Sequence, residues 1–231
     1  AVVETLKSDY LTCGPKIPEF EQAFCEYVHA KYSVAVCNAT AALHIAAMAL
    51  GVKEGDNVIC TPMTFASSAN CIRFCGGNVK FVDIDPETYL LDINKLKEIL
   101  STAPKGTYKG MVLVDFAGYP HNMEEYRKVA DEYGMWILED ACHAPGAYFI
   151  DSTGERVYCG CGKYSDITVF SFHPVKHITT GEGGMVCTQN KEYYEKMALY
   201  RTHGITHEAE KLQREDGLWS VSYTHLRAHE T

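Results

Sequence analysis

Short apolar runs alternate along this chain with longer stretches in which apolar residues recur at helical spacing. Apolar runs of four or five residues without polar alternation are typical of strands that are covered on both faces. Seven such runs predict strands at Ser33–Cys37, Asn57–Cys60, Val79–Asp83, Met111–Asp115, Met135–Glu139, Ile167–Ser171 and Met185–Thr188. Six amphipathic stretches predict helices at Glu19–Lys31, Ala41–Leu50, Ala66–Cys75, Ile93–Leu100, Met123–Tyr133 and Lys191–Tyr200.

The regular alternation of strands and helices predicts an α/β protein with a seven-stranded, mostly parallel sheet and helices on both faces. No repeat or low-complexity linker divides residues 1–207, so we expect them to form one large domain. Residues 208–231 show neither a helical nor a strand period. We expect them to be an irregular tail, frayed or foreign to the domain.

Composition excludes several classes of protein. The net charge of −9 argues against a nucleic-acid partner, which favours a basic face. No apolar run approaches the roughly 20 residues that span a bilayer, so we expect no membrane segment. Ten cysteines occur without any Cys-x-x-Cys pair, and Cys37, Cys60 and Cys187 lie in apolar runs. We therefore expect free thiols, a reducing cytoplasm and no metal site.

The segment most suggestive of chemistry is Phe170-Ser171-Phe172-His173-Pro174-Val175-Lys176, which precedes Thr179-Thr180-Gly181-Glu182-Gly183-Gly184. It puts Lys176 in a short polar loop after a predicted strand, five residues beyond Ser171. A lysine amine can hold an aldehyde cofactor as a Schiff base, and a nearby serine hydroxyl can bind its phosphate. Taken alone, however, a loop lysine is more often a solvated surface charge.

Three further motifs follow predicted strands, where open α/β sheets bind ligands. Asn38-Ala39-Thr40 opens a helix and could bind an anion, although taken alone it is more often an ordinary helix cap. Asp140, in Glu139-Asp140-Ala141-Cys142-His143, could keep a pyridine nitrogen protonated, or it could cap or form a buried ion pair. His143 could orient Asp140 or touch a cofactor, or be structural. Phe65 could stack on a flat heterocycle or pack in the core.

The sequence motifs of several other classes of enzyme site are absent from this chain. The chain has no G-x-G-x-x-G and no G-x-x-x-x-G-K-[ST], which argues against dinucleotide and P-loop sites. It also has no G-x-S-x-G and no H-E-x-x-H.

Together these motifs resemble the DegT/DnrJ/EryC1/StrS family of sugar aminotransferases, which use pyridoxal phosphate on the fold-type I (aspartate aminotransferase-like) scaffold. The resemblance covers about 200 residues in family order. It includes Leu11-Thr12-Cys13-Gly14-Pro15, Asn38-Ala39-Thr40-Ala41-Ala42-Leu43-His44, Val114-Asp115-Phe116-Ala117-Gly118, Glu139-Asp140-Ala141-Cys142-His143-Ala144-Pro145-Gly146-Ala147, the lysine loop and Arg201-Thr202-His203-Gly204-Ile205. The lysine loop is most similar to that of enzymes aminating C4 of a UDP-linked 4-keto-6-deoxy-N-acetyl-hexosamine, with the pseudaminic acid pathway transaminase nearest.

The resemblance implies a role for each site residue. Lys176 would form the Schiff base with the cofactor, and Asp140 would pair with the ring nitrogen. Phe65 would stack on the ring, and His143 would lie beside the cofactor. The phosphate would be held by three residues: Ala39, Thr40 and Ser171.

The resemblance also implies a cytoplasmic homodimer that transfers an amine, most plausibly from glutamate, to a UDP-sugar. Family members continue with a small C-terminal domain, which we expect to be absent here, and the N-terminus reads as slightly trimmed. Two alternatives stay open. One is the family's sugar 3-dehydratase, which carries histidine in place of the lysine, so that His177 requires attention. The other is a catalytically silent fragment that acts only as a binding module.

Overall fold

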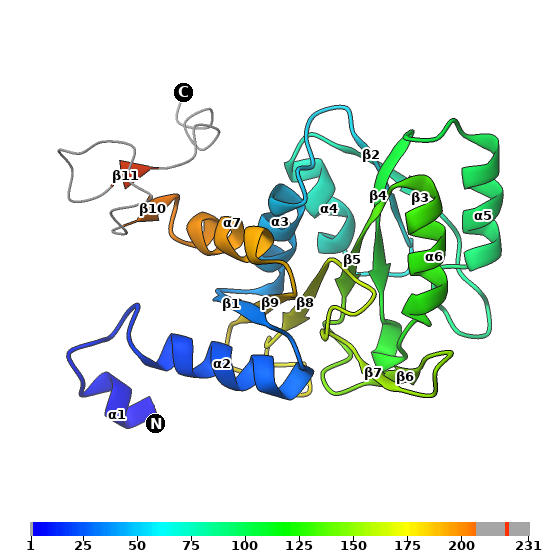
Figure 1. Cartoon of the computed structure of the whole chain (residues 1–231). Helices are drawn as coiled ribbons and strands as arrows, with labels where there is room; N and C mark the ends of the chain where they lie inside the picture. The colour runs from blue at the N-terminus through cyan, green and yellow to red at the C-terminus, as the bar shows by residue number, and fades with distance from the viewer. Residues whose placement is uncertain (1, 207–219, 222–231) are drawn as a thin grey trace.

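A seven-stranded sheet forms the centre of the protein in a computed structural model that describes residues 2–206 and 220–221 (Figure 1). The strand order is β1-β9-β8-β5-β4-β2-β3. The strands are β1 (Tyr32–Val36), β2 (Asn57–Cys60), β3 (Asn78–Phe81), β4 (Tyr108–Val114), β5 (Trp136–Asp140), β8 (Ile167–Ser171) and β9 (Gly184–Thr188). The predicted number of strands is therefore confirmed.

The sheet is parallel except at β9. Strands β3, β2, β4, β5 and β8 run parallel to one another, whereas β9 is antiparallel to both β1 and β8. No helix separates β8 from β9, so the chain returns beside β8 in the opposite direction. The loop that makes this return carries Lys176.

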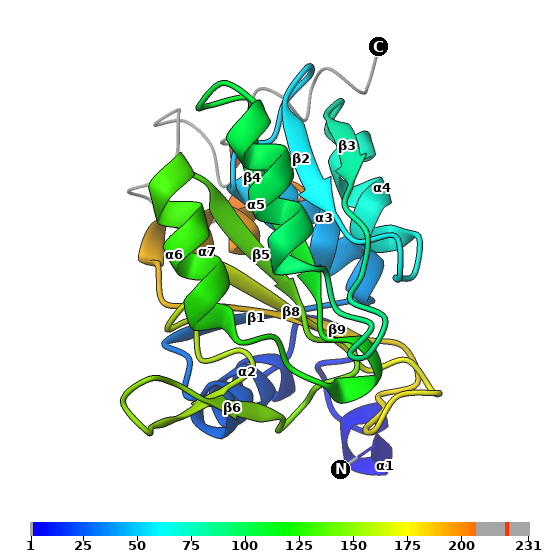
Figure 2. The same cartoon turned by 90° about the vertical axis from the view of Figure 1, so that its right-hand side faces the viewer.

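Helices cover both faces of the sheet (Figure 2). On one face lie α3 (Ala39–Ala49), α4 (Ser67–Phe74) and α7 (Lys191–Arg201), whose apolar side chains pack with those of all seven strands. On the other lie α2 (Lys16–Val28), α5 (Ile93–Thr102) and α6 (Met123–Tyr133). A short helix, α1 (Val2–Leu6), precedes them and contributes no buried residue. The predicted arrangement of helices around a mostly parallel sheet is confirmed.

Element ends differ from the prediction by up to three residues. Helix α2 begins at Lys16 rather than Glu19, and β4 begins at Tyr108 rather than Met111. Strand β1 ends at Val36, which leaves Cys37 exposed instead of packed in a strand. Exposure of a single thiol at the end of an edge strand costs little free energy. The prediction that Cys37 lies within the strand, which was based on the apolar pattern alone, is therefore wrong.

Several short elements were not predicted. A hairpin is formed by β6 (Tyr148–Ile150) and β7 (Arg156–Tyr158), η1 (Phe116–Gly118) is a 3-10 turn, and β10 (Ile205–Thr206) pairs with β11 (Ser220–Val221). Two or three residues are too few to establish a hydrophobic period. Apart from Ser220–Val221, the predicted irregular tail lies outside the described residues. Within the described part, no helix is both long and apolar enough to cross a membrane.

A polar cluster is buried on the α5 and α6 side of the sheet. It contains Asp115 and Glu139, and ligand atoms of these two residues and of Cys159 lie within 4.8 Å of one another. Asp115 Oδ1 lies 2.9 Å from Nδ1 of His121. Glu139 accepts hydrogen bonds from Thr168 at 2.6 Å and from Ser165 at 2.8 Å. The cluster thus holds two buried carboxyl groups whose hydrogen-bond partners are two hydroxyl groups and a histidine ring.

Burial changes the protonation of these groups. Desolvation raises the pKa of Asp115 to about 7. Desolvation, with the charge of Asp115 as the next contribution, raises the pKa of Glu139 to about 8. Desolvation lowers the pKa of His121 to about 3, so this ring is neutral at pH 7. At least one of the two carboxyl groups therefore retains a proton near neutral pH, because adjacent buried carboxylates cannot both be charged.

We predict that Glu139→Gln makes stability less dependent on pH. Folding raises the pKa of the Glu139 carboxyl group from 4.5 to about 8. Such a group stabilises the fold fully when the pH is below the unfolded pKa, and this contribution is lost as the pH rises through the folded pKa of about 8. A glutamine keeps an acceptor for Thr168 and Ser165 but cannot ionise. The melting temperature, followed by circular dichroism between about pH 5 and about pH 9, should fall by several degrees less in the variant, at about 2–4 °C per kcal/mol.

The matched control is Glu132→Gln, which changes an exposed glutamate of α6. It should melt as the unmodified protein does at every pH. If Glu139→Gln behaves like this control, Glu139 does not titrate in that window.

Candidate active site

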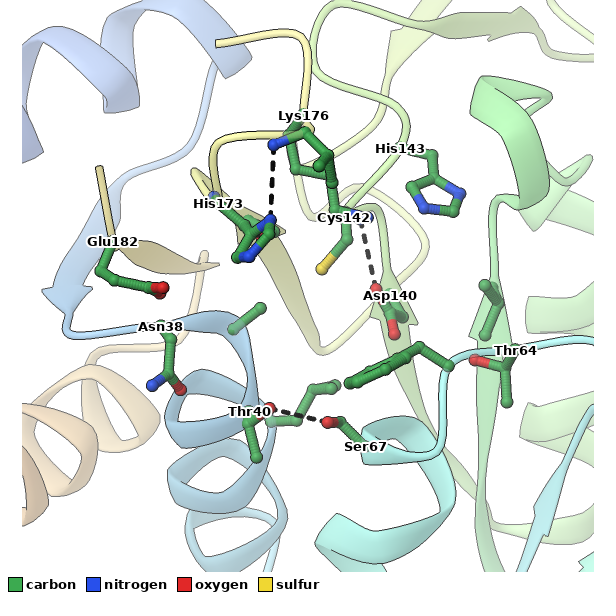
Figure 3. Close-up of a pocket in the computed structure, with 16 residues that line it drawn as sticks. Asn38, Thr40, Thr64, Ser67, Asp140, Cys142, His143, His173, Lys176 and Glu182 are labelled. Carbon is green, nitrogen blue, oxygen red and sulfur yellow. Dashed lines mark hydrogen bonds between the residues drawn. The ribbon is translucent and has the colours of Figure 1, made fainter. Parts of the chain in front are cut away.

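A cavity of about 380 Å³ opens at the carboxyl ends of β2, β5 and β8 (Figure 3). All seven residues that the sequence pointed to line it, although they come from four separate segments of the chain. The lining residues are Asn38, Ala39, Thr40, Leu43, Thr64, Phe65, Ser67, Val114, Asp140, Cys142, His143, Ser171, His173, Val175, Lys176 and Glu182. Their roles toward a cofactor stay predictions.

Lys176 reaches the cavity from the loop between β8 and β9. The loop is closed at its base, where the Phe172 N–H donates to Gly183 O at 2.9 Å and the Thr180 N–H to Phe172 O at 3.1 Å. The Lys176 N–H donates to His173 O at 2.9 Å, which makes a turn just before the lysine side chain. Within residues 2–206, no carboxylate forms an ion pair with Lys176 Nζ. The amine is therefore available to a ligand.

Asp140 ends β5 and is 5% exposed. Its Oδ2 accepts the Ser68 hydroxyl at 2.6 Å, and its Oδ1 accepts the Cys142 N–H at 3.2 Å. Among the described side chains, no lysine, arginine or histidine forms an ion pair with it. A buried carboxylate is costly unless it is paired, so this one is suited to a cationic N–H from a ligand.

The start of α3 supplies an anion site at the other end of the cavity. Asn38 caps the helix: its side chain accepts the Ala41 N–H at 2.8 Å, and its carbonyl accepts the Ala42 N–H at 3.0 Å. The preceding N–H groups, those of Ala39 and Thr40, come before any intrahelical bond and are oriented for an external acceptor. Capping and anion binding are thus compatible here, since they use different N–H groups.

Two hydroxyl groups flank this helix start. Thr40 Oγ1 lies 2.7 Å from Ser67 Oγ. Ser171, which is 6% exposed, ends β8 and lines the same cavity. Hydroxyls together with helix N–H groups form a donor set that fits a phosphate.

Phe65 is 78% exposed although it lines the cavity, which excludes the alternative that it packs in the core. An exposed phenyl ring at the mouth of a cavity offers a face on which a flat heterocycle can stack.

His143 is half-buried and its ring is oriented by the η1 turn. The Ala117 N–H donates to His143 Nδ1 at 3.3 Å, so the neutral ring carries its proton on Nε2. Burial lowers the pKa of His143, and the nearby charge of Lys176 lowers it further, against the opposing effect of Asp140. His143 is therefore a neutral donor at the edge of the cavity.

Sequence reasoning missed several lining residues, chiefly Thr64, Ser67, His173 and Glu182, and it missed Ser68 behind Asp140. The available signal was the Ser67-Ser68 pair, two adjacent hydroxyls at the start of a helix that follows a strand end. Cys142 also lines the cavity, but burial raises the pKa of its thiol well above the usual range. It is therefore not a nucleophile near neutral pH.

Comparison with known proteins gives a consistent result. The profile of the DegT/DnrJ/EryC1/StrS aminotransferase family matches residues 1–223. A Campylobacter jejuni protein named UDP-4-amino-4,6-dideoxy-N-acetyl-beta-L-altrosamine transaminase is 41% identical over 206 residues, which are 89% of this chain and 52% of that protein. The chain spans about half the length of the curated relatives it matches.

Solved structures agree. Helicobacter pylori PseC, described as an aminotransferase involved in the biosynthesis of pseudoaminic acid, matches with a TM-score of 0.80 and 32% identity, over 89% of this chain and 53% of that one. NtdA of Bacillus subtilis, solved with bound cofactor PMP, matches with a TM-score of 0.76 and 31% identity, over 88% and 44% of the two chains. The predicted fold-type I scaffold is confirmed by these neighbours.

We predict that Gly184→Ala weakens anion binding at the start of α3. Gly184 begins β9, and a Cβ there would lie 2.6 Å from Asn38 C and 2.8 Å from Ala39 N. Backbone cannot yield as a flexible side chain does, so the added methyl should displace the helix start. The dissociation constant for pyridoxal phosphate, measured by calorimetry, should rise about tenfold or more.

A suitable control is Met185→Leu, which replaces the next residue, on the opposite face of the strand, with one of similar volume. Equal affinity in Gly184→Ala and Met185→Leu would contradict the close approach of β9 to α3 as a requirement for binding.

Proposed function

This chain belongs to the DegT/DnrJ/EryC1/StrS aminotransferase family, and on that premise we propose that it forms the cofactor-binding domain of a pyridoxal phosphate-dependent sugar nucleotide aminotransferase. One observation carries the proposal: a lysine amine and a buried carboxylate, neither of which has an ion-pair partner among the described residues, line the same cavity. A pyridoxal group needs both, one for its aldehyde and one for its ring nitrogen.

The donor set fits the whole cofactor. Lys176 would hold the aldehyde carbon, and Asp140 would keep the proton on the ring nitrogen. The N–H groups of Ala39 and Thr40, with the Ser171 hydroxyl, would bind the phosphate. Phe65 would cover one face of the ring, and His143 would donate from Nε2 to an oxygen at the ring edge. When bound, pyridoxal phosphate supplies an electron sink for the carbon that carries the amine.

Lys176 would then serve a second purpose. Once released from the aldehyde carbon, its Nζ is the lining amine that can take a proton from the amine-bearing carbon and return it. The Asp140 carboxylate would keep the ring nitrogen protonated throughout, because hydrogen bonds from Ser68 and from the Cys142 N–H hold the carboxylate in place.

The lining of the cavity favours amine transfer over the family's dehydratase reaction. Among the residues that the structure describes, Lys176 lines the cavity and His177 does not. The position that histidine occupies in the family's dehydratase is therefore occupied by Lys176 in this cavity.

For the substrate we propose a UDP-linked 4-keto-6-deoxy-N-acetyl-hexosamine, with glutamate as the amine donor. Support comes from the Campylobacter jejuni relative, whose name describes a UDP-linked 6-deoxy-N-acetyl sugar that carries its amine at C4. The ketone with the same carbon skeleton is the compound that an amine transfer would convert to such a product.

We also propose that the intact protein works as a cytoplasmic homodimer. Two large apolar side chains that line the cavity are exposed to solvent: Phe65 is 78% and Val175 is 79% exposed. Apolar side chains that gather at one mouth are typical of a surface that a partner covers.

We predict that Lys176→Ala abolishes the borohydride-reducible visible absorbance of the intact protein loaded with pyridoxal phosphate. Lys176→Arg should do the same, because a guanidinium stays protonated and cannot attack an aldehyde. The control is Lys97→Ala, an exposed lysine of α5 on the other side of the sheet. Absence of any reducible absorbance in the unmodified protein would support the silent binding module instead.

We predict that Asp140→Asn retains the cofactor but lowers turnover by roughly two orders of magnitude or more. An asparagine cannot hold the ring nitrogen in its protonated form, so the electron sink is lost. Turnover is measured by mass spectrometry of UDP-4-keto sugars incubated with isotope-labelled glutamate. Transfer of the label into the sugar tests the substrate and the donor together, and near-normal turnover in the variant would refute the role of Asp140.

A further inference from the structure

Two adjacent serines at the start of α4 connect the opposite ends of the cavity. Ser67, which is 6% exposed, lies 2.7 Å from Thr40 on α3. Ser68, which is fully buried, donates to Asp140 Oδ2 at 2.6 Å. Consecutive residues of one helix thus contact the anion site on one side and the buried carboxylate on the other.

The direction of the hydrogen bonds around Ser68 follows from its partners. An ionised carboxylate only accepts, so the single hydroxyl proton of Ser68 is committed to Asp140. Thr64 Oγ1 lies 2.7 Å from Ser68 Oγ, and Thr64 must therefore be the donor of that bond. A chain of donors runs from Thr64 through Ser68 to Asp140, and each bond in such a chain polarises the next.

Both oxygens of Asp140 are consequently fixed. Oδ2 is held by Ser68 and Oδ1 by the Cys142 N–H at 3.2 Å, which leaves the carboxylate little freedom to rotate. Hydrogen bonds to a charged group contribute more than those between neutral groups. Removal of the Ser68 hydroxyl should therefore affect Asp140 more than removal of the Ser67 hydroxyl affects Thr40.

We propose that Ser67 and Ser68 are positioning residues that set the two ends of the cofactor site at a fixed separation. This inference rests on the proposed function. Ser68 orients the Asp140 carboxylate toward the ring nitrogen, and Ser67 orients the Thr40 hydroxyl toward the phosphate. Because both are on the first turn of α4, a shift of that helix would move both ends together.

Three ligands separate the two roles without any measurement of turnover. They are pyridoxal phosphate, pyridoxal, which has no phosphate, and the deaza analogue of pyridoxal phosphate, in which a carbon replaces the ring nitrogen. Dissociation constants are measured by calorimetry for the intact protein and for Ser67→Ala and Ser68→Ala. Ser101→Ala is the matched control, because Ser101 is an exposed serine of α5. Circular dichroism melting checks that each variant folds.

Ser68→Ala should raise the dissociation constants for pyridoxal phosphate and pyridoxal about tenfold or more, and that for the deaza analogue little. Ser67→Ala should raise those for the two phosphorylated ligands about threefold to tenfold, and that for pyridoxal little. The conservative variant Ser67→Thr, which keeps the hydroxyl, should restore phosphate-dependent affinity.

Equal losses for all three ligands would overturn the proposal, because they would indicate a general packing defect. Values equal to those of Ser101→Ala would overturn it as well, while the proposed function would stand if the unmodified protein binds pyridoxal phosphate with reducible absorbance. Failure of the unmodified protein to bind it at all would overturn both.

Discussion

The alternation of side chains along β5 is the constraint on which the site depends. Leu138 and Asp140 face α3 and α4, whereas Ile137 and Glu139 face α5 and α6. A slip of one residue in the pairing of β5 would exchange Glu139 and Asp140 between the faces. The register is fixed on both sides, since Asp140 is paired with Val114 on β4 and with Val169 on β8.

The two adjacent carboxyl groups meet different environments because of this alternation. Glu139 faces Asp115, with burial and a like charge favouring its protonated form. Asp140 faces an open cavity, with two donors and space for a cation. One strand end therefore provides both a neutral buried acid that belongs to the core and a carboxylate that is left for a ligand, and no change in backbone conformation is needed.

Much of the fold and half of the site could be predicted because the relevant signals are local. All seven lining residues named in advance belong to motifs that end or follow predicted strands, and strand ends of a parallel sheet meet at one edge. The antiparallel direction of β9 and the β6–β7 hairpin could not be predicted. A short apolar run has no signal for its direction, and strands of three residues have no measurable period.

The contacts that orient the site were not predictable for a different reason. Ser68 and Asp140 are 72 residues apart, and Thr40 and Ser67 are 27 apart. Whether a serine at a helix start caps its own helix or donates to a distant carboxylate depends on the tertiary arrangement. In this protein, the exposed Phe65 and the buried Ser67 and Ser68 lie within four consecutive residues. One short segment therefore provides an aromatic ring at the cavity and the two hydroxyl groups that contact Thr40 and Asp140.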